Sequence, residues 1–183
     1  MNARVFFAAG AVSLGLLTAG LQADAIVVDP IEVGTGLFSS FVQIDFEQGD
    51  TFVFEVFYNE TTTTSFDLLL ILDSDAELGF QLEFTTSGFR PFVNGFGFDG
   101  IFESDASSDS FWLCWTKPSD EETWALAQDG AANTVATPGS WDGWVFGNEF
   151  PGLAPKNVII PAPAATAVLG GLFIGCGRRR RKA

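Results

Sequence analysis

The 183-residue chain contains no histidine. The Ser-His-Asp and Cys-His nucleophile systems need an imidazole base, and the usual zinc sites need imidazole ligands. The absence therefore excludes these two catalytic classes and the usual zinc centres. No glycine-rich phosphate loop precedes a helical pattern, so nothing indicates a nucleotide-binding P-loop.

Cysteine is scarce, with Cys114 in the middle of the chain and Cys176 near its end. A domain without the C-terminal tail would hold Cys114 alone, so it could form no internal disulfide, and an exported domain of this size does not need one. Cys114 lies in the apolar run 111–115, FWLCW. This setting favours a buried small apolar residue over a reactive thiol.

Basic residues are rare between positions 26 and 160, where Arg90, Lys117 and Lys156 stand against 22 acidic residues, giving a formal charge of −19. Such a surface repels nucleic acid and anionic lipid, so no nucleic-acid partner is expected. Disorder is not indicated, because the chain has 20 phenylalanines and five tryptophans. These 135 residues suit one domain of ordinary size.

The N-terminal 25 residues have the three parts of a secretory signal peptide. Arg4 provides the basic start, residues 5–21 are apolar, and Ala23 and Ala25 form an A-x-A cleavage site. We therefore expect export through the Sec translocon and cleavage by signal peptidase, so that the mature chain starts at Ile26. The alternative is an uncleaved anchor helix.

The C-terminal tail also has three parts, a Pro-rich entry at 160–163, an uncharged segment at 164–177, and the basic cluster Arg178, Arg179, Arg180, Arg181 and Lys182. An uncharged run of 14 residues is short of the roughly 20 needed to span a bilayer, and extension back to Val158 gives a marginal span. Basic clusters stay in the cytoplasm. The tail thus predicts a hydrophobic transmembrane helix in the inner membrane, with the domain outside.

This tail resembles a PEP-CTERM sorting signal, the tag carried by exosortase substrates. The motif position reads Pro161, Ala162 and Pro163, with both prolines at the family spacing and Ala162 in place of the family's glutamate. The resemblance covers about the last 24 residues. It implies that a membrane-embedded exosortase cuts near Pro163 and releases the domain or attaches it at the envelope, so that the inner membrane is a transient partner. The alternative is a plain C-terminal membrane anchor.

Between the two ends, alternation of apolar and polar residues predicts strands. They lie at 37–46 and 51–58, which form an antiparallel hairpin, and at 78–84, 111–116, 124–128 and 141–146, with a strand-turn-strand unit at 89–102 turning at 94–95 or 99–100. Residues 66–72 remain open between a short helix, capped by Ser65 or Asp67, and a buried strand. The sequence predicts a mainly β or α+β fold: a single antiparallel-sheet domain with at most one short helix.

The region 45–147 is similar in pattern to the C-terminal domains of transcobalamin-like proteins. The shared features are paired tryptophans in one strand, another in the next strand, and the run Gly-Ser-Trp-Asp-Gly-Trp at 139–144. The resemblance implies a β-grasp-like fold of a sheet with one helix. We take it as an expectation about the fold and not about corrinoid binding.

The five tryptophans gather within one third of the expected domain, at Trp112, Trp115, Trp124, Trp141 and Trp144. Clustered tryptophans fill the core of many β domains, and they also stack on sugar rings when exposed. Alternation places Trp112 and Trp115 on opposite strand faces, which allows one of them to face solvent. All five are therefore candidate ligand-facing aromatics.

The acidic residues suggest little chemistry. Glu55 and Glu83 stand out inside clear strands, where a solvated sheet face is favoured over an acid-base pair of a hydrolase. Residues 73–77 begin like a calcium loop, but Leu78 and Phe84 replace the required glycine and glutamate. No cofactor is expected, and a looser Ca²⁺ site is left open.

The sequence thus predicts three segments: a signal peptide at 1–25, an exported mainly-β domain at 26–160 and a sorting tail at 161–183. The expected function is that of an exported, exosortase-sorted cell-envelope or extracellular-matrix protein with a structural or adhesive, non-enzymatic role. The alternative is a glycan- or small-ligand-binding module that uses exposed aromatics, with exopolysaccharide as a candidate partner. An acid-base hydrolase is a third hypothesis.

Overall fold

The computed structural model describes residues 25–88, 90–105 and 109–161. Most of the expected signal peptide, including Ala23, lies outside these ranges, as do Ala162 and Pro163 of the expected sorting motif and the basic cluster 178–182. Ala25 and Pro161 lie at the two ends of the described chain and are exposed. Within the described ranges, no helix combines the length and the apolar character that crossing a bilayer requires.

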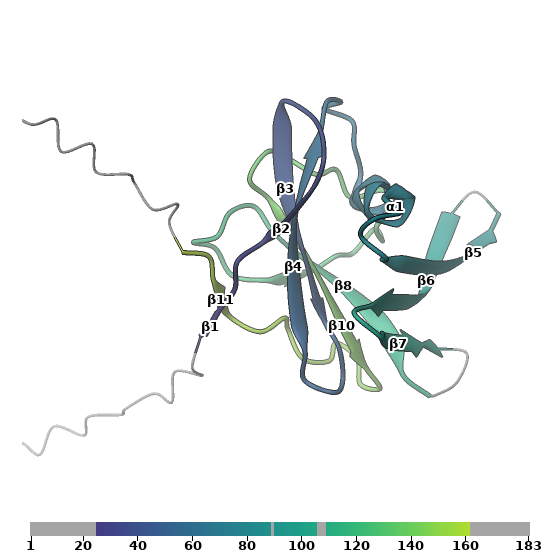
Figure 1. The fold of residues 1–183 in the computed structure, drawn as a ribbon. Coiled ribbons are helices and arrows are strands. Elements are labelled where there is room, and N and C mark those ends of the chain that lie inside the picture. The colour runs from purple at the N-terminus through teal and green to yellow at the C-terminus, as the bar shows by residue number, and fades with distance from the viewer. Residues whose placement is uncertain (1–24, 89, 106–108, 162–183) are drawn as a thin grey trace, which may run out of the picture.

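The larger sheet has six strands in the order β2-β4-β3-β10-β8-β9 (Figure 1). Their bounds are Ile31–Gly34, Thr51–Tyr58, Phe38–Asp45, Trp141–Gly147, Phe111–Lys117 and Ala125–Leu126. The expected hairpin of β3 and β4 is confirmed. The sheet also contains two parallel pairs, β2 with β4 and β3 with β10, which local patterns could not indicate.

The smaller sheet has three antiparallel strands, β5 (Gln81–Ser87), β6 (Arg90–Phe98) and β7 (Ile101–Ser104). The chain turns between β6 and β7 at Asp99 and Gly100, both with positive φ. The other candidate turn, at 94–95, is wrong. Glu83 pairs with Gly95 and Phe84 with Val93, so Asn94 is the extra residue of a β-bulge.

Residues 66–72, which the sequence left open, belong to helix α1 (Ser65–Ser74). The N-cap is Thr64, whose hydroxyl accepts a hydrogen bond from the Asp67 backbone N–H, while the Asp67 carboxylate accepts from the Thr64 N–H. This reciprocal capping box satisfies two backbone donors that a helix start leaves unpaired. The predicted mainly-β domain with one short helix is thereby confirmed for the described residues.

Both faces of the larger sheet are covered, at least in part. Side chains of one parity, such as Ile44, Phe54 and Trp144, form the main core with α1 and the smaller sheet. Side chains of the other parity, including Val53 and Trp141, form a minor cluster on the opposite face. This division follows from the two-residue period of a strand.

The minor cluster is closed by the two terminal strands, β1 (Ile26–Val27) and β11 (Val158–Ile159), which pair in parallel. Val158 is buried in that cluster. Figure 1 shows β1 and β11 on the side of the larger sheet opposite to α1 and the smaller sheet. The described domain therefore begins and ends at neighbouring points on its surface.

Candidate functional site

An apolar cavity of about 270 Å³ opens between β6 and β8. We call it the aromatic hollow; its walls are residues 91–93, 112–114, 126–128, 130 and 131, together with Trp144 and Phe150. Ligand pockets are commonly apolar clefts with a few polar groups at one side. The aromatic hollow fits this description and is the candidate binding site.

The base of the aromatic hollow is made by Trp112 of β8 and Trp144 of β10, which project toward the smaller sheet. Phe96 of β6 packs against both, with ring centroids 4.7 Å from Trp112 and 5.3 Å from Trp144. The Trp112 indole N–H donates to the Glu103 carbonyl. These contacts fix the two indoles, so the base of the hollow is preformed.

The exposed aromatic surface of the hollow comes from phenylalanine, not tryptophan. Phe92 is 54% exposed and Phe150 is 74% exposed, whereas Trp112 and Trp144 are 5% and 3% exposed. Sequence reasoning missed both phenylalanines. A chain with 20 phenylalanines gives no signal that distinguishes the two from those of the core.

A more polar cavity of about 440 Å³ adjoins the aromatic hollow, and we call it the polar hollow. The two share Pro91, Phe92, Gln128, Gly130 and Ala131, and the polar hollow adds residues 87, 90, 129, 132 and 133. The Asn133 amide donates to the Asp129 carbonyl at 2.9 Å, which holds the loop in place. The combined site has an apolar half and a polar half.

Arg90 is exposed in the polar hollow, and within the described ranges no hydrogen bond or ion pair engages its guanidinium. The two other cations of the domain are occupied. Lys117 pairs with Asp120, and the Lys156 ammonium donates to the Gly49 carbonyl. Arg90 is thus the cation most available to a ligand.

The remaining candidate tryptophans lie outside this site. Trp115 and Trp141 are 9% and 1% exposed, and both indole N–H groups lack a protein partner. Trp124 is partly exposed and lines another cavity together with Lys117. Four of the five candidate residues are therefore buried, and only Trp112 and Trp144 belong to the aromatic hollow.

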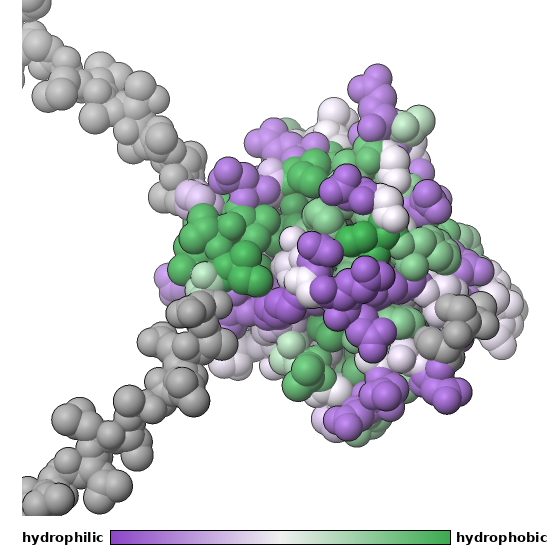
Figure 2. Space-filling view, turned by 60° about the horizontal axis from the view of Figure 1, so that its bottom comes forward, coloured by the Kyte–Doolittle hydropathy of each residue, from purple (hydrophilic) through white to green (hydrophobic). Residues whose placement is uncertain are grey.

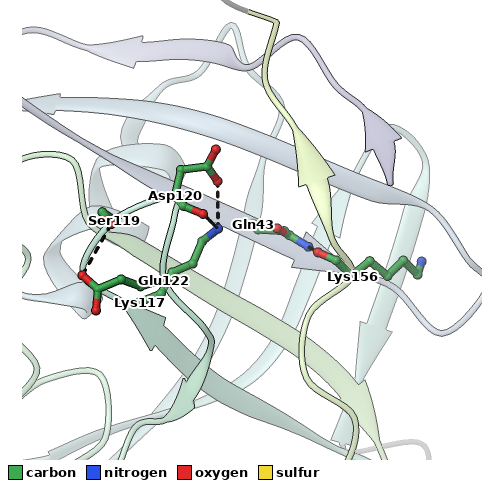
Figure 3. A network of polar contacts seen from close by, with 6 residues as sticks. All are labelled: Gln43, Lys117, Ser119, Asp120, Glu122 and Lys156. Carbon is green, nitrogen blue, oxygen red and sulfur yellow. Dashed lines mark hydrogen bonds and ion pairs between the residues drawn. The ribbon is translucent and has the colours of Figure 1, made fainter. Parts of the chain in front are cut away.

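Trp124 and Trp141 are engaged by a cation of the chain itself. The Lys117 ammonium lies 4.3 Å from the Trp141 ring centroid and 5.0 Å from that of Trp124. It also donates to the Asp120 carboxylate at 2.9 Å (Figure 3). An ammonium above an indole face is attracted to the ring, more strongly when it is desolvated. These two rings therefore stabilise a buried lysine.

Glu55 and Glu83 are not the only acids inside the strands, because two other strand acids are buried. Asp45 of β3 and Asp142 of β10 are 3% and 2% exposed. By contrast, Glu55 and Glu83 are less buried, and each accepts a hydrogen bond of 2.7 Å from a serine. Both buried acids are in strands recognised from the sequence, but their burial depends on what covers each sheet face.

Burial raises the pKa of Asp142 to about 7, and the nearby Ser65 hydroxyl opposes this shift. The Asp142 Oδ2 atom itself has no hydrogen-bond partner, and neither does the Ser65 hydroxyl. Asp142 is thus a buried carboxyl whose hydrogen-bonding capacity is only partly used. Its pKa is set by desolvation, as in catalytic acids, but burial alone does not define a catalytic pair.

Cys114 forms part of the wall of the aromatic hollow. Although the residue is partly exposed by surface area, desolvation raises the pKa of its thiol well above the ordinary value, and the Asp142 charge adds to this. A protonated thiol is a poor nucleophile. The structure therefore supports the expectation of an apolar residue rather than a reactive one.

The acidic run at 73–77 serves the end of α1. Asp73 accepts from the Leu82 N–H, and Asp75 accepts from the backbone N–H groups of Glu77 and Leu78. Among the residues described, no three His, Cys, Asp or Glu side chains gather as a metal site would require. The described residues therefore offer no cluster of ligands for the loose Ca²⁺ site that the sequence left open.

A larger open cavity of about 630 Å³ lies between α1 and the loop after β4. Several of its polar groups are already engaged within the protein. Asn59 accepts from the Leu37 N–H, and Asp67 belongs to the capping box. We therefore regard the aromatic and polar hollows as the better candidate.

Comparison with known proteins adds little. No protein-family model matches the chain, and no curated protein matches it. It is similar to the crystal structure of a "putative metal binding protein" from Ruminococcus gnavus ATCC 29149, with 14% sequence identity and a TM-score of 0.41. The match covers 61% of this chain and 97% of that one. A likeness this distant carries no argument about fold or function.

Proposed function

We propose that the chain is an exported, exosortase-sorted protein of the cell envelope or extracellular matrix, with an adhesive or structural role that involves no catalysis. The signal peptide supports export, and the PEP-CTERM-like tail supports sorting by an exosortase. The observation that supports it structurally is the pairing of β1 with β11. Ala25 and Pro161, the described residues next to the two expected processing sites, are both exposed, and the strands between them start at Ile26 and end at Ile159.

An adhesive role is supported by where the exposed aromatics lie. Phe84, Phe92 and Phe102 of the smaller sheet are 40%, 54% and 51% exposed. This sheet is on the other side of the domain from the terminal strands (Figure 1). Phe84 packs in part against Phe66 of α1, with ring centroids 5.1 Å apart, whereas Phe92 and Phe102 have the larger exposed fractions. Exposed apolar side chains of this size commonly mark an interaction site. Attachment through the C-terminal end would leave the smaller sheet directed away from the anchor.

A second apolar surface lies beside the terminal segments, where Figure 2 shows hydrophobic residues next to the grey tails. Ile26, Val27 and Ile159 are 39%, 67% and 51% exposed. It suits a domain held close to a membrane by the tail before processing, because transfer of apolar side chains from water to the membrane surface is favourable. The acidic remainder keeps the released domain dispersed.

The proposal is tested by intact-mass analysis of the native protein from fractionated cells. We expect a mature chain that starts at Ile26, ends near Pro163 and is recovered from the envelope or the medium. A double variant, P161A/P163A, should retain its C-terminal tail and stay in the inner membrane. A cytosolic protein with Met1 and Ala183 intact would refute the proposal.

A ligand-binding module is a second candidate, and the preformed aromatic hollow favours it. This role is compatible with the proposed adhesive role, since an exported adhesive protein must bind a ligand or a surface. It predicts that the Trp112 and Trp144 fluorescence responds to a ligand.

A further inference from the structure

We propose that the aromatic and polar hollows together bind a neutral saccharide, with one pyranose ring stacked on Phe92 and its hydroxyl groups directed to Arg90 and Asp129. The inference deepens the ligand-binding role proposed above by naming the ligand class, and it rests on that role.

The apolar half of the site fits the C–H face of a sugar ring. A pyranose presents weakly positive C–H groups on one face, and an aromatic ring presents its negative face. Phe92 is 54% exposed at the boundary of the two hollows and belongs to both. Cavities of about 270 and 440 Å³ are near the usual range of about 300–1,000 Å³ for ligand pockets.

The polar half supplies the donors and acceptors that sugar hydroxyls need. The Arg90 guanidinium offers five N–H donors in a planar fork, and the Asp129 carboxylate is an acceptor; the described residues give neither side chain an internal hydrogen bond. The two side chains are not within ion-pair distance of each other. A hydroxyl both donates and accepts, so a row of them can satisfy the two groups together.

Charge favours a neutral ligand. The polar hollow holds one cation and one anion, while residues 26–160 carry a formal charge of −19. A polyanionic saccharide would be repelled by that field. A purely apolar ligand would desolvate Arg90 and Asp129 without pairing them, which is unfavourable. A neutral, polyhydroxylated ring with an apolar face avoids both penalties.

The test uses the native processed protein and follows its tryptophan emission during titration. The probes are neutral oligosaccharides (cello-, malto-, xylo- and mannotetraose) and one acidic probe, tetragalacturonate. We expect saturable binding of at least one neutral probe and none, or much weaker binding, of the acidic one. Trp112 and Trp144 provide the signal because they line the hollow.

Two variants test the residues, and one serves as a matched control. F92A and R90A should each weaken the affinity about tenfold, the effect of losing one good contact. F102A removes an equally exposed phenylalanine, at 51%, from the same small sheet but away from the hollow, and should bind like the native protein. R90A changes an exposed side chain, so it tests binding even where F92A unfolds.

No saturable response to any neutral probe overturns the inference, as does tighter binding of tetragalacturonate. Equal losses of saccharide affinity in F92A and F102A would overturn the assignment of the binding site to the two hollows. Failure here is separable from failure of the proposed sorting, because processing and fractionation of F92A and R90A are measured on the same samples. Normal processing without saccharide binding would leave the sorting proposal standing and refute this one.

Discussion

At the scale of single residues, Asp142 decides how the domain responds to pH. Its carboxyl has an ordinary pKa of 3.8 when exposed and a pKa of about 7 in the fold, because burial disfavours the charged form. Between these values the folded protein binds more protons than the unfolded chain. The free energy of unfolding therefore falls as pH rises from about 4 to about 7.

The expected loss is at most about 4 kcal/mol, from 1.36 kcal/mol per pKa unit over the shift. D142N should flatten this part of the stability curve, since an amide of the same shape does not titrate. Urea unfolding at a series of pH values measures the effect. A D142N protein that kept the full slope between pH 4 and 7 would contradict the role assigned to Asp142.

Sequence patterns described some residues well and others poorly. The alternating pattern at 51–58 agrees with the structure, where Phe54 and Tyr58 lie on the core face of β4, because side chains of a strand alternate between its two faces. It could not reveal that Asp142 is buried, because the covering elements come from distant parts of the chain. The same limit hid Phe92 of the aromatic hollow, since every phenylalanine looks like core in a sequence.

At the scale of elements, β10 holds the larger sheet together because it pairs with β3 on one side and β8 on the other. The β3–β10 pairing joins segments about 100 residues apart, with Trp141 opposite Phe41, and nothing in either strand's sequence specifies its neighbour. The helix was equally ambiguous, because its run of leucines suits a buried strand until the Thr64–Asp67 cap is seen.

Gly143 in β10 permits the covering of the minor face, and its substitution should be costly. An added Cβ would lie 2.9 Å from the Trp124 ring and still closer to Pro155. G143A should destabilise the domain by about 1–3 kcal/mol, the usual result of overpacking. G147A is a matched control, because the space around Gly147 at the end of the same strand is open to 4 Å. Thermal unfolding of both variants checks this, and equal melting temperatures would refute it.

At the scale of the whole molecule, the acidic surface opposes its own folding. Residues 26–160 have a formal charge of −19, and these charges lie closer together in the folded state than in the unfolded chain. Their mutual repulsion therefore destabilises the folded state. Salt shortens the Debye length from about 30 Å at 0.01 M to about 8 Å at 0.15 M. We expect the melting temperature to rise over this range of NaCl. A melting temperature that falls or stays constant would show that self-repulsion is not an important term.

The C-terminal segment is fastened to an interior strand and not only to β1. The Lys156 N–H donates to the buried Asp45 carboxylate, and the Gln43 amide donates to the Lys156 carbonyl at 2.9 Å (Figure 3). If the protein is held by its C-terminal end, tension from flow or from neighbouring cells enters at β11 and passes through Lys156 into β3. From β3 the load passes to β10, which pairs with it and carries Trp144 of the aromatic hollow, so a pull on the anchor is felt at the base of the binding site.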